Sequence, residues 1–327
     1  NTNAIIELEN KIKISSKEEV IEEVSYTWFN RFTALQYMDI NDLNDVKVIL
    51  PKEGNTRAEI LSNAIGGIFH EDLVSEKTKE IVSSLLDGRS SNINPEKEAY
   101  RLLIIEVCNQ LNSKMPFLFE KINDYTELLM PDDIFSKSSI ITKIREVMTK
   151  DNSKNIEVIG WLYQFYISEK KDEVFAGLKK NKKVTPENIP AATQLFTPRW
   201  IVQYLVENSL GRLWMLNNPK SNLTHQMKYY INPGKFETDF IKISSPEEIK
   251  ICDPACGSGH MLIYSFDLLY AIYEEEGYSS DSIPSLILSK NLYGIELDQR
   301  AGQLSAFSLT MKAKERDRNF FEKSIET

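Results

Sequence analysis

The sequence predicts an α + α/β protein, in which a helical N-terminal domain precedes the first part of a parallel α/β sheet domain. Helical stripes of apolar residues dominate about the first 180 residues. The basic stretch "GLKKNKKVTPENIP" at 177–190 then marks a change in composition. From about residue 248 we expect strand, helix, helix, strand and helix, an order typical of a parallel sheet.

The helical region shows apolar residues at steps of three and four. In "SKEEVIEEVSYTWFNRFTALQYM", one stripe is formed by Ile21, Val24, Trp28, Phe32 and Leu35, and 98–111 and 156–171 are similar. We interpret these stripes as buried helix faces. With the composition change as the junction, the sequence predicts a helical domain at 1–183 and a second domain at 184–327.

The composition excludes several classes of protein. The chain has 327 residues, 42% of them hydrophobic, with no apolar run long enough to span a membrane and no signal-peptide pattern. Its three cysteines fit a reducing cytoplasm and argue against a disulfide framework. The formal net charge of −9 gives no overall attraction to nucleic acid, so contact with DNA would need a local basic patch.

The second domain begins with a punctuated helix. In "TQLFTPRWIVQYLVENSLG", Thr197 is a candidate N-cap, Pro198 the first helical residue and Gly211 the end. We expect further helices at 281–290 and 299–324, the second capped by Asp298.

The stretch "CDPACGSG" (252–259) ends the first expected strand. Gly257 and Gly259 allow a tight turn and a close approach of backbone to a ligand. A dinucleotide fingerprint would need a third glycine where Leu262 stands, and Asp253 would repel a phosphate. An acid at this place suits a cation such as an ammonium group, which favours S-adenosylmethionine. Glu296, at the end of the second expected strand (291–297), is in the usual place of a ribose-binding acid.

The three segments together resemble a known family. "DPACGSG", with "TQLFTP" before it and "LYGIELD" after it, resembles the γ order of N6-adenine-specific DNA methyltransferases. With "EEVSYTWFNRFTALQYMDIND" (22–42), the chain is most similar to the PglX-like enzymes of the BREX phage-defence systems. The resemblance implies a Rossmann-like S-adenosylmethionine-dependent fold. It also implies that the full-length protein methylates double-stranded host DNA at a specific site and has other defence-system proteins as possible partners.

The resemblance also implies roles for individual residues, following the cofactor from its methionine end to its adenine. The methionine end would contact Phe196, Thr197 and Pro198. The glycine loop would comprise Asp253, Ala255, Gly257 and Gly259, with Asp253 near the ammonium group. Glu296 would bind the ribose, and Ile295 or Leu297 would lie against the adenine.

The part of the active site that holds the target base is not found. Such methyltransferases carry an Asn/Asp-Pro-Pro-Tyr/Phe motif that grips a flipped adenine. The nearest string, "INPGKF" (231–236), precedes the glycine motif and lacks the second proline and the aromatic residue. We therefore expect a fragment truncated before this motif, with no catalytic residue of its own and no activity alone.

Other interpretations differ in class. Cys252, Cys256 and His260 have a C-x3-C-x3-H spacing, but zinc sites normally show paired ligands and a fourth partner, so we expect no metal. Cys252 is more simply a strand core residue and His260 a polar group at a helix start. The alternatives are a non-catalytic protein or DNA interaction module with a remnant methyltransferase domain, and a methyltransferase for RNA, protein or a small molecule. A dinucleotide dehydrogenase comes last.

Overall fold

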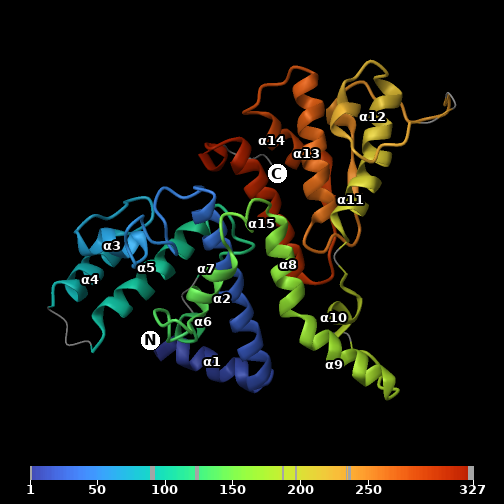
Figure 1. The fold of residues 1–327 in the computed structure, drawn as a ribbon. Helices are drawn as coiled ribbons and strands as arrows, with labels where there is room; N and C mark the ends of the chain where they lie inside the picture. The colour runs from blue at the N-terminus through green and yellow to red at the C-terminus, as the bar shows by residue number, and fades with distance from the viewer. Residues whose placement is uncertain are drawn as a thin grey trace. The chain divides into compact units, whose positions relative to one another are not determined.

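The computed structural model describes residues 2–88, 93–121, 125–185, 188–195, 197–232, 234 and 237–322. By packing, the chain divides into two compact units, Asn1–Asn155 and Ile156–Thr327. Residues 156–183, expected in the helical domain, therefore pack with the second unit (Figure 1). As a boundary between functional domains, 183/184 stays a prediction.

The first unit is built from helices. Its bounds are α1 Thr2–Ile14, α2 Lys17–Ile40, α3 Glu59–Ile65, α4 Glu76–Leu86, α5 Pro95–Leu111, α6 Tyr125–Leu128 and α7 Ile140–Val147. α2 begins at the cap Ser16, whose hydroxyl accepts the Glu19 N–H. The predicted stripe lies within α2, so the helical prediction for this region is confirmed. Four of its residues are buried, Val24, Trp28, Phe32 and Leu35, but Ile21 is 49% exposed, so its interpretation as part of the buried face was wrong.

One buried acid organises the end of α2. The Asp39 carboxylate accepts the backbone N–H groups of Val48, Ile49 and Leu50 at 3.1, 2.6 and 3.0 Å. The Asn44 amide is a fourth donor, at 2.8 Å. Burial raises the pKa of Asp39 to about 6, although these hydrogen bonds lower it. Asp39 therefore fixes the segment that follows α2 onto the helix.

The second unit combines helices with a small parallel sheet. Its α-helices are α8 Glu157–Tyr166, α9 Ser168–Lys179, α10 Ile189–Thr193, α11 Arg199–Val206, α12 Arg212–Asn217, α13 His260–Glu275, α14 Ile283–Leu286 and α15 Gln299–Arg316. In the part of the unit that the structure describes, there are also the π-helical segments η2 Glu207–Gly211 and η5 Ile287–Asn291 and the short 3₁₀ helices η3 Leu223–Gln226, η4 Pro246–Glu248 and η6 Phe320–Glu322. Strands β1 Ile251–Asp253 and β2 Leu292–Gly294 pair in parallel, with Ile251 opposite Leu292. The expected order of strand, helix, helix, strand and helix is confirmed.

The core of this unit centres on α13. Its residues Phe266, Leu269 and Ile272 are buried in a cluster with side chains from α11, β2 and α14. Within the described residues, no helix is long and apolar enough to cross a membrane.

Two expectations for the helix after Thr197 were wrong. Pro198 is the N-cap, with no side-chain cap bond, so Thr197 does not cap the helix. The helix does not end at Gly211 either, because Gly211 adopts helical angles and the chain continues through η2 into α12. The missing Cβ at Gly211 instead leaves room for the side chain of Met227.

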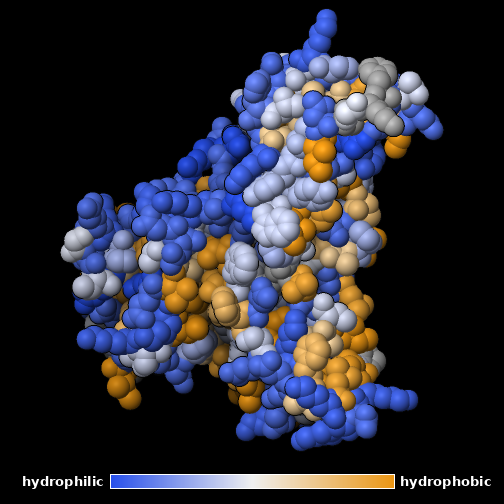
Figure 2. Space-filling view, turned by 45° about the vertical axis from the view of Figure 1, so that its right-hand side comes forward, coloured by the Kyte–Doolittle hydropathy of each residue, from blue (hydrophilic) through white to orange (hydrophobic). Residues whose placement is uncertain are grey.

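The apolar stripe at 156–171 is only partly a core face. Ile159, Tyr163 and Ile167 are buried, but Trp161 is 40% exposed and Phe165 is 72% exposed. Figure 2 shows orange side chains gathered at the lower right of the view, at the level of α8, α9 and α10. The interpretation of this stripe as core packing therefore holds for one face of α8 and not for the other.

Candidate functional site

The candidate site lies at the carboxyl ends of β1 and β2. Asp253, the last residue of β1, is paired with Gly294, the last residue of β2. Beyond the strands, the Ile295 N–H donates to the Asp253 carbonyl at 2.9 Å, and the Cys256 N–H donates to the Ile295 carbonyl at 3.0 Å. These two bonds hold the loop after β1 against the segment after β2. The two segments are adjacent because β1 and β2 are parallel neighbours, whose carboxyl ends lie at the same edge of the sheet.

The glycine loop has the conformation that its sequence predicts. Gly257 and Gly259 have φ values of 54° and 89°, a region that favours glycine. Gly259 is the N-cap of α13, and a Cβ there would lie 3.1 Å from Cβ and 3.2 Å from Cα of Ser305 on α15. The Asp253 carboxylate accepts the Ala255 N–H at 3.2 Å and so shapes the start of the loop.

Glu296 joins this loop to the second strand. Its Oε2 accepts the Gly257 N–H at 2.6 Å, and its Oε1 accepts the Asp298 N–H at 2.9 Å. Each carboxylate oxygen has a second lone pair for another donor, such as a ribose hydroxyl. On either side of Glu296, Ile295 is 61% exposed and Leu297 is 75% exposed. The structure therefore places the predicted ribose acid against the predicted glycine loop, with apolar side chains beside it.

The electrostatic potential at the loop is negative. Burial raises the pKa of the Cys256 thiol, and the charges of Asp253 and Glu296 raise it further, against a hydrogen bond from Ser305 that lowers it. Such a potential suits a cationic ligand and disfavours a phosphate. Among the described residues, no group of three metal-ligating side chains occurs. Cys252 is exposed, so its interpretation as a strand core residue was wrong, because no described element covers that face of the short β1.

His260 connects the segment that contains Thr197 and Pro198 with the end of the glycine loop. This residue is the first of α13, as expected, and its ring hydrogen-bonds the backbone of Thr197. Burial lowers the pKa of the imidazole, while Glu157 and the Thr197 bond raise it. Thr197 is half-buried, Pro198 is exposed, and Phe196 lies outside the described residues. Asp298 caps α15 by accepting the Arg300 N–H at 3.1 Å, which confirms that prediction.

One element of the site was missed from the sequence. α8 packs against the glycine loop at Gly160, where a Cβ would lie 2.8 Å from Nε2 of His260 and 3.1 Å from Cβ of Ser258. Two other residues of α8 make polar contacts near the site. Glu157 forms an ion pair with Arg199 at 3.6 Å, and the Tyr163 hydroxyl donates a hydrogen bond to Asp298. The available signal was a glycine inside a helical stripe, which costs about 1 kcal/mol relative to alanine and so suggests a packing reason.

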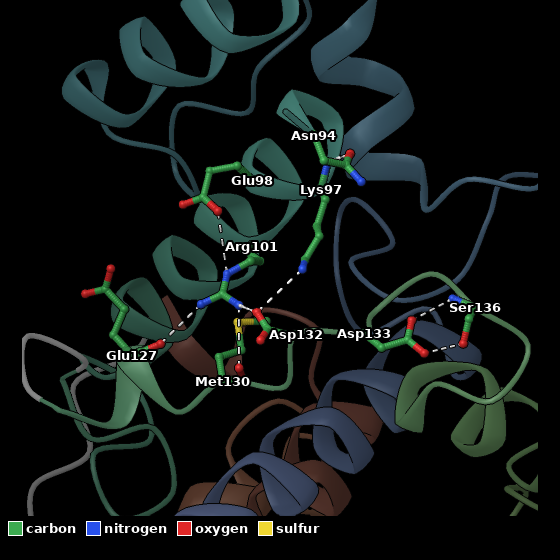
Figure 3. A network of polar contacts seen from close by, with 9 residues as sticks. All are labelled: Asn94, Lys97, Glu98, Arg101, Glu127, Met130, Asp132, Asp133 and Ser136. Atoms are coloured by element: carbon green, nitrogen blue, oxygen red, sulfur yellow. Dashed lines mark hydrogen bonds and ion pairs between the residues drawn. The ribbon is translucent and has the colours of Figure 1, made fainter. Parts of the chain in front are cut away.

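A second polar network lies in the first unit and has a structural explanation. Figure 3 shows Arg101 of α5 beside the backbone carbonyls of Glu127 and Met130, at 3.4 and 3.5 Å. The ion pairs of Arg101 and Lys97 with Asp132 are both 3.5 Å long, and Asp132 is almost fully exposed. Exposed pairs contribute little. Arg101 therefore fastens the 127–132 segment to α5, and the network brings together none of the predicted site residues.

Comparison with known proteins shows that the chain is similar to DNA methyltransferases. Residues 242–327 match a family described as the DNA-methyltransferase domain of MmeI. The chain is 42% identical, over 94% of its length, to the adenine-specific methyltransferase BrxX of Escherichia coli O9:H4 (strain HS). It is 37% identical, over 93% of its length, to the adenine-specific methyltransferase PglX of Lacticaseibacillus casei (strain Zhang). These matches confirm the resemblance to PglX-like adenine-specific methyltransferases, including the helical region. They cover 25% and 26% of the relatives, so the chain spans about a quarter of their length.

Proposed function

We propose that the chain is the cofactor-binding part of an adenine-specific DNA methyltransferase of the PglX-like kind. The methyl donor is S-adenosylmethionine, and the acceptor is the N6 amine of adenine in double-stranded DNA, bound by the full-length protein in the cytoplasm together with other proteins of a BREX-type defence system. The second unit is then the first part of a Rossmann-like fold. The observation that carries the proposal is the double contact of Glu296, which joins the glycine loop to the end of β2.

The residues present fit this cofactor. The negative potential from Asp253 and Glu296 matches its ammonium and sulfonium charges, and the positive φ values of Gly257 and Gly259 give the loop the tight turn after β1 that the proposed cradle needs. Ile295 and Leu297 offer exposed apolar surface for the adenine ring. Thr197 and Pro198, beside His260, are the proposed contacts of the methionine end, with Phe196 assigned by sequence alone.

In the proposed reaction, S-adenosylmethionine would supply an activated methyl group. The bond from the methyl carbon to the amine nitrogen would form as its bond to sulfur breaks, which leaves S-adenosylhomocysteine, and the amine would lose one proton to solvent. The residues of this chain bind and orient. Asp253 would hold the ammonium group, Glu296 would accept hydrogen bonds from the ribose hydroxyls, and the backbone of the glycine loop would lie beside the bound cofactor. None of these residues is assigned a catalytic step.

A dinucleotide fits the same loop less well. Asp253 would lie close to a pyrophosphate and repel it. Leu262 occupies the place of the third fingerprint glycine, and its side chain is buried against Gly294, where an added Cβ would lie 2.9 Å from Leu262 Cδ1. The leucine thus packs α13 onto β2.

Isothermal titration of the full-length protein with S-adenosylmethionine tests the proposal. We expect Asp253→Ala with Glu296→Ala to weaken binding at least about tenfold, because hydrogen bonds to charged groups contribute about 1.5–3 kcal/mol each. The matched control removes two exposed acids at the end of α13, Glu274→Ala with Glu276→Ala, and should leave binding unchanged. Undiminished binding in the first variant would contradict the site assignment.

The substrate needs a separate measurement. Sequencing of genomic DNA from cells with and without the gene should show N6-methyladenine at one sequence only where the wild-type gene is present. Cofactor binding without any gene-dependent methyladenine would move the proposal to a methyltransferase of RNA, protein or a small molecule.

A further inference from the structure

We propose that α8 is part of the cofactor cradle and that Tyr163 is a positioning residue, which holds Glu296 in place through Asp298. The inference rests on the proposed function and extends it to a helix that lies before all three sequence motifs and outside the 242–327 family match. Figure 1 shows α8 beside α15, at whose start Asp298 lies.

One face of α8 contacts each of the three motif segments. Residues three apart along a helix lie on the same face. In α8, Glu157, Gly160 and Tyr163 have this spacing. Their contacts are, in order, Arg199 after the Thr-Pro motif, Ser258 and His260 in and after the glycine loop, and Asp298 after the ribose acid. Two of these contacts are polar, those of Glu157 and Tyr163, and the third is a close approach of the backbone at Gly160. A helix that served only to cover the core would not need this combination.

Gly160 lets α8 approach the glycine loop closely. The added Cβ of an alanine would meet His260 Nε2 at 2.8 Å and Ser258 Cβ at 3.1 Å, and it would collide with the Ser258 hydroxyl. Ser258 is almost fully buried, between the two glycines of the loop. A larger side chain at 160 would therefore push α8 away from the loop and lengthen the path from Tyr163 to Asp298.

Tyr163 reaches Glu296 in two steps. Its buried hydroxyl donates to Oδ2 of the buried Asp298, whose Oδ1 caps α15 by accepting the Arg300 N–H at 3.1 Å. The Asp298 N–H in turn donates to Oε1 of Glu296 at 2.9 Å. Tyr163 thus fixes the first residue of α15, and with it the donor that orients the carboxylate proposed to bind the ribose.

The test compares two ligands on the full-length protein by isothermal titration. One is S-adenosylhomocysteine, and the other is its 2′,3′-dideoxy analogue, which lacks the ribose hydroxyls. We expect Tyr163→Phe to weaken binding of S-adenosylhomocysteine about tenfold and binding of the dideoxy analogue less than about twofold. The matched control is Tyr204→Phe on α11, at a tyrosine that is 40% exposed, and it should change neither affinity.

A second pair of variants tests the contact of the helix itself. Gly160→Ala should reproduce the ribose-dependent loss. Gly177→Ala in α9 should not, because a Cβ there meets only ordinary contacts, with Lys182 atoms at 3.8 Å.

The outcomes separate the two proposals. If Tyr163→Phe weakens the binding of both ligands equally, Tyr163 is a packing residue. If it weakens the binding of neither ligand, Tyr163 does not orient Glu296. Either result overturns the inference, while the proposal of a cofactor site stands. If the wild-type protein binds neither ligand, or binds them equally, the proposed cofactor site fails and the inference fails with it.

Discussion

The sharpest structural prediction concerns Gly259→Ala in the glycine loop. The φ value of 89° costs an L-residue about 1–2 kcal/mol. The new Cβ would also lie 3.1 and 3.2 Å from Cβ and Cα of Ser305, and overpacking of this kind costs about 1–3 kcal/mol. We therefore expect the free energy of unfolding of the second unit to fall by about 2–5 kcal/mol.

Differential scanning calorimetry of the full-length protein can measure this loss. The relevant transition is the one that S-adenosylhomocysteine shifts upward. At about 3 °C per kcal/mol, Gly259→Ala should lower its midpoint by about 6–15 °C. Gly277→Ala is the matched control, because Gly277 has a φ of 80° but no atom within 4 Å of an added Cβ, and it should cost about 3–6 °C. Equal shifts in the two variants would refute the close approach of the loop to α15.

Two further predictions concern buried acids. Asp39 titrates near pH 6 when folded and near its ordinary 3.8 when unfolded, so its contribution to stability is complete below about pH 3.8 and is lost as the pH rises to about 6, a change of about 3 kcal/mol. Asp39→Asn should abolish this slope in the unfolding midpoint of the first unit, and a retained slope would contradict the assignment. Glu207 accepts the Tyr264 hydroxyl at 2.7 Å and the Tyr229 N–H. Glu207→Gln places an amide donor opposite one of these two donors, so it should lower the free energy of unfolding of the second unit by about 1–3 kcal/mol in the same calorimetry. Glu276→Gln, at an exposed acid, should leave this free energy unchanged.

The sequence predicted those parts of the fold that depend on local patterns. The glycine loop, the helix start at His260 and the cap at Asp298 were all predicted, because each depends on residue types within a few positions. The end of the helix at Gly211 was predicted wrongly for the same reason. Glycine is a local stop signal, but here its missing Cβ serves a contact with Met227, which lies 16 residues further along the chain.

The sequence predicted where the candidate site residues lie along the strands, but not the contacts that they make. Asp253, Gly257 and Glu296 could be placed at neighbouring strand ends by the rules of parallel sheets. The direct bond from the Gly257 N–H to Glu296 could not, because it depends on the return of the loop onto the segment after β2. Nor could the exposure of Cys252, since a strand's apolar alternation does not say which face other elements cover.

The position of α8 bears on where the cofactor-binding domain begins. The change of composition at 177–190 predicted that this domain begins at residue 184. A basic stretch indicates a solvent-exposed segment, but it does not indicate which helices pack together. The compact unit starts at Ile156 because Gly160 and Tyr163 make contacts more than 90 residues away along the chain, with Ser258 and Asp298. Such contacts leave no periodic trace in the sequence beyond a single glycine in a helical stripe. If α8 orients the ribose acid as we propose, a cofactor domain that began at residue 184 would lack one of its own positioning residues, and the boundary suggested by packing is also the one that function requires.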